Sequence, residues 1–126
     1  MKLTIDLTQN GLDSVFVPWE KTAVTILCEG GEYMSGALTD EINRRVAPED
    51  RMSQASVVGL LKDLYALRIV EEKDVFKKSG ELSKYKSYYS NYDLDGLCDH
   101  LASLAENWAL YTRNNSSTKT VKENER

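Results

Sequence analysis

The sequence predicts a mainly α-helical fold with a small β-hairpin (α+β). Three observations predict it: helical spacing of apolar residues in three segments of residues 18–67, a tyrosine-rich extended pattern in 70–92, and a heptad pattern in 93–113. The 126 residues suffice for one domain and a tail. The sequence has no run of eighteen apolar residues and no apolar leader, so we expect a cytoplasmic protein that does not contact a membrane.

The N-terminal segment, residues 1–17, is ambiguous. Alternating apolar residues flank Asn10-Gly11, which is a turn signal, so the segment is either an irregular arm or a short hairpin. The first helix is expected to begin at Pro18, because a first-turn N–H has no partner to lose. It is expected to end at Gly30-Gly31.

Two further helices are predicted on either side of a loop. The second begins at Ser35, a suitable N-cap, and ends near Val46, and the acidic loop 47–52 follows it. The third begins near Ser53. Its wide apolar face consists of Val57, Val58, Leu61, Leu64 and Leu67.

The pattern then changes to a hairpin and a final helix. The hairpin covers about 70–92 and turns at Lys78-Ser79-Gly80. The helix begins at Asp93, a natural N-cap, and ends near Arg113. Its apolar residues are alternately three and four apart, which is a heptad seam of Leu94, Leu97, Leu101, Leu104, Trp108 and Tyr111.

Three helices followed by a two-stranded hairpin form the layout of a winged helix-turn-helix, here with an added long C-terminal helix. The expected organisation is an arm or short hairpin (1–17), a winged-helix domain (18–92), a dimerisation helix (93–113) and a disordered tail (114–126). The heptad seam has two possible interpretations. Its apolar side chains cover the domain's own core, or they pair with the same helix of a second chain. We expect a homodimer, because an exposed leucine and tryptophan stripe would favour aggregation, and hence a pseudo-palindromic DNA site.

Three segments carry a resemblance to a known family. They are Met34–Ile42, with an apolar pair four apart after a small turn residue, Ser53–Val70, a polar start followed by leucines, and Lys84–Tyr89, which is basic and tyrosine-rich. Together they resemble the winged-helix transcriptional regulators, most closely the PadR group and next the MarR-type regulators. The chain departs from the group's pattern at Arg68, where glycine is usual, in residues 92–96 and in the acidic helix 2–3 loop. The resemblance implies a DNA-binding repressor with a dimerising C-terminal helix, released by an unknown small-molecule or redox signal.

A recognition helix offers short polar groups near its start to base edges in the major groove. Gln54 can pair bidentately with adenine, Ser53 and Ser56 can reach bases or phosphates, and Lys62 is expected on a phosphate. Alternatively, Ser53 only caps the helix and Gln54 is merely exposed to solvent.

Two groups of cations are expected on DNA phosphates. The junction of the second and third helices carries Arg44, Arg45 and Arg51, which can instead stabilise a helix C-terminus. The hairpin carries Lys77, Lys78, Lys84 and Lys86, which can instead protect a strand edge. The net charge is −4, but residues 44–86 carry +3 between acidic flanks, either as a binding surface or as ordinary variation.

Enzymatic and metal chemistry are not predicted. Cys28, Cys98 and the single histidine, His100, cannot supply the ligands of a structural zinc site, and no cofactor is expected. Both cysteines are expected to be buried on apolar helix faces, with a redox role as the alternative. His100 is expected on a helix surface, and the tyrosines of the return strand are expected to pack on the core rather than to stack on bases. No phosphate loop or nucleophile motif is present, so we expect no enzyme.

The function favoured by the sequence is a sequence-specific regulator of transcription that binds double-stranded DNA as a homodimer. The alternative is a winged helix that docks on a protein of the transcription or replication machinery, which the acidic flanks favour. A non-specific architectural binder is a third, less favoured class, because such proteins usually carry more positive charge. One surface shared by Gln54 with five cations would favour DNA, and these cations are Arg44, Arg45, Arg51, Lys78 and Lys84. Interruption of that surface by Glu49, Asp50 and Asp63 would favour a protein partner.

Overall fold

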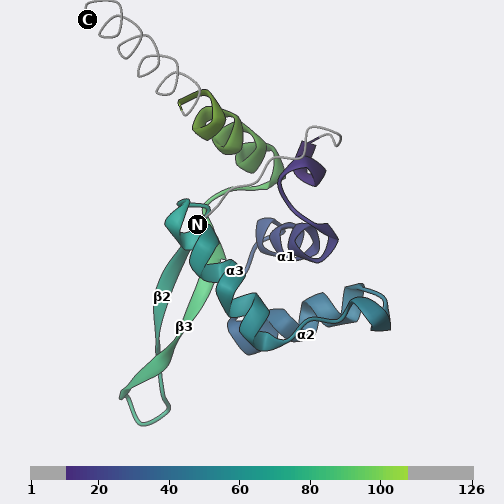
Figure 1. The fold of residues 1–126 in the computed structure, drawn as a ribbon. Helices are drawn as coiled ribbons and strands as arrows, with labels where there is room; N and C mark the ends of the chain where they lie inside the picture. Colours follow the sequence, from purple (N-terminus) through teal and green to yellow (C-terminus); the bar gives the residue numbers. More distant parts are fainter. Residues whose placement is uncertain (1–10, 108–126) are drawn as a thin grey trace, which may run out of the picture.

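The structure is a computed structural model that describes residues 11–107. Its elements are η1 (Gly11–Ser14), α1 (Pro18–Cys28), β1 (Tyr33–Met34), α2 (Ser35–Arg45), η2 (Pro48–Asp50), α3 (Gln54–Ala66), β2 (Val70–Phe76) and β3 (Leu82–Ser90). Residues 94–107, here called the C-terminal helix, are also helical. The hairpin of β2 and β3 projects away from the three helices, and the C-terminal helix lies at the opposite end of the molecule (Figure 1).

The sheet has three antiparallel strands in the order β1-β3-β2. β1 pairs with β3 through Tyr33 and Tyr88, and β2 pairs with β3 from Val70 and Ser90 outwards. Sequence analysis predicted the hairpin but missed β1, because two residues are too few to show a period. The helices and this sheet follow one another in the winged-helix order, so the predicted fold class is confirmed.

The helix boundaries agree with the sequence signals. Pro18 occupies the first turn of α1, and Ser53 caps α3 by accepting a hydrogen bond from the Ser56 backbone N–H at 3.2 Å. The predicted loop 47–52 contains the short helix η2. In the N-terminal segment, the hairpin alternative is wrong for residues 11–14, which form a 3-10 helix, while the predictions for residues 1–10 lie outside the described residues.

The hydrophobic core is formed by side chains of the helices, the sheet and the segments between them. Side chains of the C-terminal helix contribute to it, because Leu97 is fully buried and Leu101 is 8% exposed. The remaining buried apolar residues are Phe16, Ala23, Val24, Ile26, Leu27, Leu38, Ile42, Val57, Leu60, Leu61, Leu64, Ile69 and Val70. The first part of the heptad seam therefore covers the domain's own core.

The end of α3 is a Schellman motif closed by a non-glycine residue. Arg68 has a φ of 63°, in the left-handed region, and its backbone N–H donates to the Tyr65 carbonyl at 3.0 Å. The Ile69 N–H donates to the Leu64 carbonyl at 2.9 Å, and both of these side chains are buried. Sequence analysis noted a missing glycine here, and the backbone shows that this position does adopt the conformation that glycine favours.

The C-terminal helix is fixed to the end of α3 by polar contacts. Asp93 Oδ1 accepts the Gly96 N–H at 2.7 Å and so caps the helix. His100 Nε2 donates to the Leu67 carbonyl at 2.8 Å, and its Nδ1 accepts from the Tyr92 hydroxyl at 3.2 Å. The Tyr92 and His100 rings are stacked with centroids 4.7 Å apart. His100 is therefore half-buried and structural, and the prediction of a surface histidine is wrong. Among residues 11–107, no helix is long and apolar enough to cross a membrane.

Candidate nucleic-acid interface

The outward face of α3 is only partly the polar face that the sequence predicts. Gln54, Gly59 and Lys62 are exposed as expected. Ala55 is also exposed, and Tyr65 is 40% exposed. This face therefore has polar groups and Ala55 at its start, Gly59 near its middle, and Lys62 and Tyr65 in its second half.

A hydrogen-bonded polar cluster lies where α3 begins against the start of α2. The Ser53 and Ser56 hydroxyl oxygens are 3.1 Å apart. The exposed Gln54 side chain donates from Nε2 to the Ser35 hydroxyl at 3.0 Å. Gly36 lies beneath it, where a Cβ would be 3.7 Å from the Gln54 amide. Ser53 thus caps the helix, while Gln54 is held in an exposed position with an amide oxygen and one N–H left for a ligand.

Sequence analysis missed Ser35 as a member of this cluster. It was interpreted only as the N-cap of the second helix, but Met34 occupies that position and Ser35 is the first helical residue. No sequence signal separates these two roles, because the contact between Ser35 and Gln54 joins residues that are nineteen positions apart.

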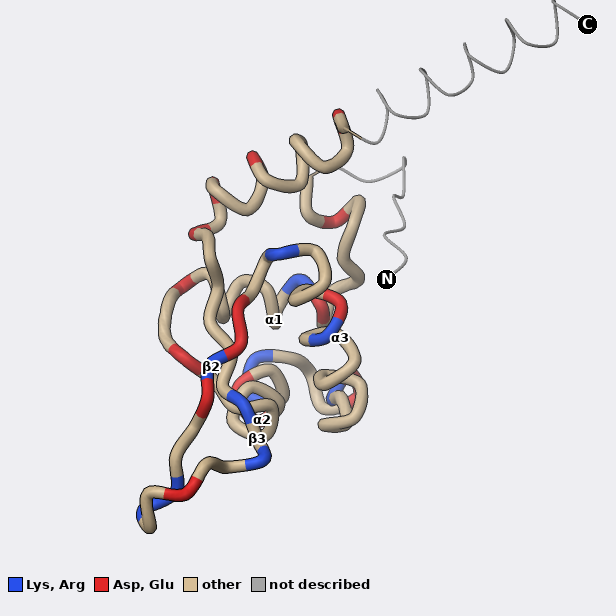
Figure 2. Tube along the Cα trace, turned by 90° about the vertical axis from the view of Figure 1, so that its left-hand side faces the viewer, with Lys and Arg blue, Asp and Glu red and all other residues tan. Residues whose placement is uncertain are grey.

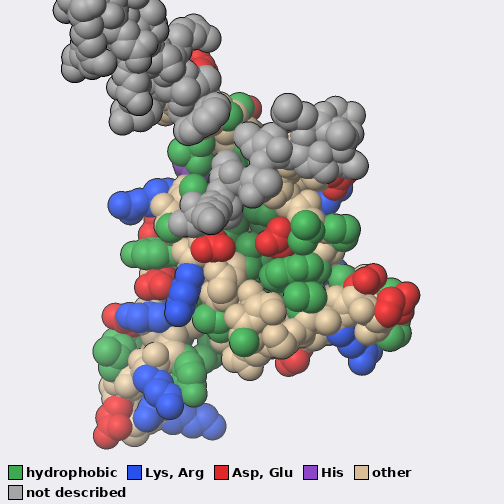
Figure 3. Space-filling model, in the orientation of Figure 1, with side chains coloured by type: hydrophobic (Ala, Val, Ile, Leu, Met, Phe, Trp, Pro, Cys, Tyr) green, Lys and Arg blue, Asp and Glu red, His purple; other side chains and the backbone are tan. Residues whose placement is uncertain are grey.

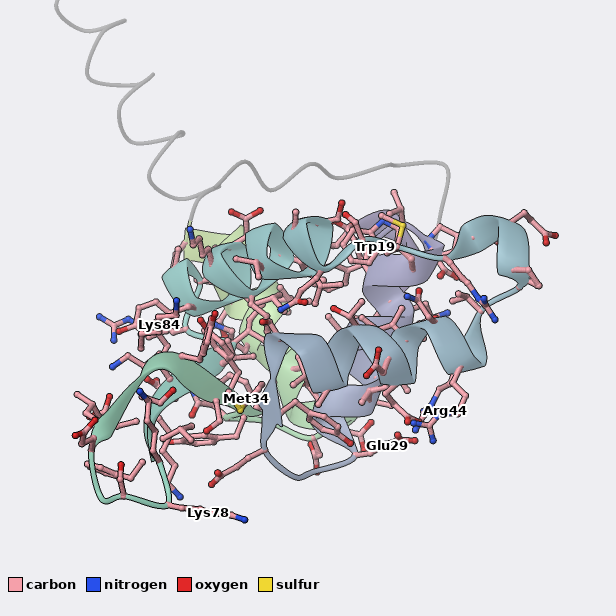
Figure 4. The ribbon with its side chains drawn as sticks, turned by 90° about the horizontal axis from the view of Figure 1, so that it is seen from below. Trp19, Glu29, Met34, Arg44, Lys78 and Lys84 are labelled. Atoms are coloured by element: carbon pink, nitrogen blue, oxygen red, sulfur yellow. The ribbon has the colours of Figure 1, made fainter. Side chains whose placement is uncertain are left out.

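The two arginines at the end of α2 are engaged in ion pairs. Arg44 lies 2.9 Å from a Glu41 carboxylate oxygen, and Arg45 lies 2.8 Å from Glu29 and 3.0 Å from Glu41. Hydrogen bonds to Glu29 and then to Glu41 raise the pKa of Arg45 above its ordinary value. Figure 4 shows Arg44 beside Glu29, far from Lys78 and Lys84 on the hairpin. The structure therefore does not bring these arginines together with the hairpin lysines.

Arg51 lies in a different part of the surface. It lines a hollow beside the acidic residues Glu49 and Asp50 of η2, together with Trp19 and Met52. This acidic neighbourhood is the interruption that the sequence analysis associated with a protein partner.

Several cations of the described part of the chain have no carboxylate partner, and three of them lie on the hairpin. Lys86 pairs with Asp74, but within residues 11–107 no carboxylate oxygen lies within 4.0 Å of Lys77, Lys78 or Lys84. Lys84 Nζ lies 5.1 Å from the centroid of the Tyr85 ring. Basic side chains gather over the hairpin in the space-filling view (Figure 3).

Charge is separated along the molecule. Residues 94–107 contain the carboxylates Asp95, Asp99 and Glu106 and no lysine or arginine, and Figure 2 shows this acidic helix far from the end of the hairpin. The hairpin itself also carries the carboxylates Glu71, Glu72, Asp74 and Glu81. A polyanion is therefore attracted to the unpaired lysines at the hairpin end and repelled by the acidic residues of the C-terminal helix.

The tyrosines of the hairpin divide into two groups. Tyr88 and Tyr92 pack against the core, and burial raises the pKa of the Tyr88 hydroxyl. Tyr85 is 54% exposed and Tyr89 is 37% exposed. The expected core packing thus applies to the residues nearest the helices and not to Tyr85.

The two cysteines occupy different environments. Cys28 is half-buried with its Sγ 3.7 Å from the Ser90 hydroxyl, and burial raises the pKa of its thiol. Cys98 is exposed, so the expectation that both are buried is wrong for this residue. Cys98 precedes Leu101 by three residues and Ala102 by four, which is the spacing of residues on one helix face. Leu101 is buried in the core, whereas Ala102 is exposed like Cys98. Among residues 11–107, no group of three metal-ligating side chains is present.

Comparison with known proteins gives one structural likeness. No protein-family model and no curated protein matches the chain. The crystal structure of a PadR-like transcriptional regulator from Bacillus cereus strain ATCC 14579 is similar over 78% of this chain and 87% of its own, with 17% sequence identity and a TM-score of 0.48. At this level of likeness, the fold assignment rests on the topology described above.

Proposed function

We propose that this chain is a regulator of transcription that binds double-stranded DNA, with the start of α3 in the major groove and the hairpin along the phosphates. The observation that carries the proposal is the placement of Lys77, Lys78 and Lys84, free of described acidic partners, on a hairpin that projects beyond the helices. A projecting cationic hairpin beside a helix with a polar start matches the two requirements of duplex binding, phosphate contact and base contact.

The base contact is assigned to Gln54. Its exposed amide is already oriented by Ser35, and a bidentate pair with adenine discriminates by about 1–3 kcal/mol against a wrong base. The Ser53 hydroxyl accepts the Ser56 N–H as the helix cap, and the two hydroxyls are also in hydrogen-bond contact. We therefore assign Ser53 and Ser56 only a peripheral contact with a phosphate. Lys62 is assigned to a phosphate.

The arginines of α2 are assigned a different role. Arg44 and Arg45 would have to leave Glu41 and Glu29 to contact a phosphate. We assign Arg45 to holding the end of α2 against the end of α1 through Glu29. Arg44 is assigned to its pair with Glu41 within α2, and Arg51 is left as a peripheral contact.

The homodimer remains part of the proposal. Leu97 and Leu101 are occupied by the chain's own core, but Leu94 is 39% exposed. An apolar hollow of about 300 Å³ lies between η1 and the C-terminal helix, lined in part by Val15, Cys98 and Ala105. Trp108 and Tyr111 lie outside the described residues. We expect sedimentation equilibrium to give twice the chain mass, and Leu94→Glu to shift it towards the monomer.

The test of the phosphate contact is a salt titration of duplex binding by fluorescence anisotropy. Lys78→Ala combined with Lys84→Ala should weaken binding to all sequences and reduce the slope of log K against log salt by about 0.9 per lost phosphate contact. Lys21→Ala is the matched control, because Lys21 is an exposed cation paired with Asp13 at 2.9 Å and lies outside the interface. An unchanged slope in the double variant would contradict the assignment.

A protein-docking winged helix is the second candidate, and the small apolar face of α3 favours it. Ala55, at the start of α3, and Gly59, near its middle, are both exposed on that face. Ala55→Lys separates the two functions. An added cation there should strengthen duplex binding if the partner is DNA, whereas it should abolish docking if the partner is a protein packed on this face.

A further inference from the structure

The end of the hairpin carries an exposed apolar pair that neither the core nor the phosphate contacts explain. Phe76 is 65% exposed and Leu82 is 55% exposed. The two residues are directly opposite each other in the register of β2 and β3, so their side chains lie on the same face of the hairpin. Contiguous exposed apolar surface is a feature of interaction sites.

The backbone holds this pair rigidly at the tip. The Gly80 N–H donates to the Lys77 carbonyl at 2.9 Å, and the Lys77 N–H donates to the Glu81 carbonyl at 2.8 Å. Gly80 has a φ of 87°, which closes the turn without strain. The register slips between Asp74 and Phe76, which bends the end of the hairpin relative to its base.

The charges around the pair indicate what kind of surface it meets. Lys77 and Lys78 follow Phe76 directly, and Lys84 follows Leu82 by two residues. One carboxylate, Glu81, directly precedes Leu82, so the cations outnumber it three to one. None of these lysines has a described carboxylate within 4.0 Å. The complementary surface is apolar at its centre and anionic on both sides. The minor groove of a duplex has this character, because stacked bases lie between two rows of phosphates.

We propose that Phe76 and Leu82 form a wedge that enters a base step from the minor groove and bends the duplex, while Lys77, Lys78 and Lys84 bind the flanking phosphates. This inference rests on the proposed function and adds a mode of recognition to it. Partial unstacking costs less at flexible pyrimidine–purine steps. The wedge therefore selects sequence by deformability, at positions that Gln54 does not contact.

The test uses the full chain and two duplexes of identical length, labelled at both ends for energy transfer. One duplex is fully paired, and the other carries a central two-base mismatch that removes most of the cost of unstacking. The wild-type protein should shorten the end-to-end distance of the paired duplex, with a kink of about 20–90°. It should also bind the mismatched duplex about ten-fold more tightly, because the mismatch saves part of an unstacking cost of a few kcal/mol.

Two variants separate the wedge from the phosphate contacts. Phe76→Ala combined with Leu82→Ala should still bind the paired duplex, but without bending it and without preferring the mismatch. Lys77→Ala combined with Lys78→Ala should weaken binding to both duplexes alike and keep the preference. Because all four side chains are exposed, both variants should keep the wild-type Tm, and Phe76→Leu should retain the bend.

The outcomes distinguish the wedge from the proposed function. Binding of the paired duplex by the wild-type protein without a bend, or an equal bend in the Phe76 and Leu82 double variant, overturns the wedge and leaves DNA binding intact. Failure of the wild-type protein to bind either duplex overturns both. In that case, a lower oligomeric mass of the double variant would assign the apolar pair to a protein contact instead.

Discussion

The left-handed backbone at Arg68 gives a quantitative test of how α3 ends. An L-residue in this conformation is less stable than glycine by roughly 1–2 kcal/mol. Glycine in turn costs about 0.4–1 kcal/mol more in unfolded-chain entropy. Arg68→Gly should therefore raise the free energy of unfolding by about 0.5–1 kcal/mol. The contacts made by Arg68 through its backbone, to Tyr65 and from Asn91 at 3.1 Å, are kept in this variant.

A substitution series isolates the backbone contribution. Arg68→Ala removes the same exposed side chain but keeps the Cβ, so its stability should match the wild type within about 0.5 kcal/mol. Arg68→Asn should lie between alanine and glycine, and Arg68→Val should be destabilised, because β-branched residues resist positive φ. Urea denaturation measures the order, and the gain for glycine corresponds to a Tm increase of about 2–6 °C. A glycine variant less stable than the alanine variant would refute the strained Schellman end.

Three further predictions concern the cap, the last helix and the thiols. Ser53→Ala should cost about 1 kcal/mol in urea denaturation through loss of the cap at α3, whereas Ser53→Asp should retain it. Leu97→Ala should cost about 2–5 kcal/mol, because Leu97 is 0% exposed. Ser103→Ala, at an exposed position of the same helix, should cost less than about 0.5 kcal/mol, and equal losses would contradict a helix that is part of the domain core. At pH 8, Cys98 should be alkylated faster than Cys28, because burial raises the pKa of the Cys28 thiol above 9.0 and lowers its thiolate fraction. The Cys28→Ser and Cys98→Ser variants identify each rate, and the rate of Cys28 should continue to rise with pH beyond 9.0.

Helix positions were predictable because their signals are local. Pro18, Ser35 and Ser53 mark the starts of three helices within one residue, since first-turn proline and capping chemistry act over a few neighbouring positions. The strand β1 was not predictable, because its existence depends on pairing with β3, more than fifty residues later.

The candidate site was only partly predictable for the same reason. The hairpin lysines were found from composition, but the ion pair between Arg45 and Glu29 joins two elements and changes what that arginine is free to bind. The exposure of Phe76 was likewise hidden, because an apolar residue at the end of a strand pattern is ordinarily a core residue. Two residues of the heptad seam, Leu97 and Leu101, are buried in the core of the same chain. The spacing alone could not distinguish this packing from pairing with a second chain.

Selection of bound duplexes from a random DNA pool at moderate salt tests the central claim most directly. The account predicts an enriched motif with two related half-sites, an adenine preference within each half-site that Gln54→Ala removes, and flexible steps where the hairpin reaches the minor groove. Recovery of no motif, together with binding that disappears as salt rises, would contradict a sequence-specific regulator and would favour a winged helix that docks on protein through the apolar face of α3.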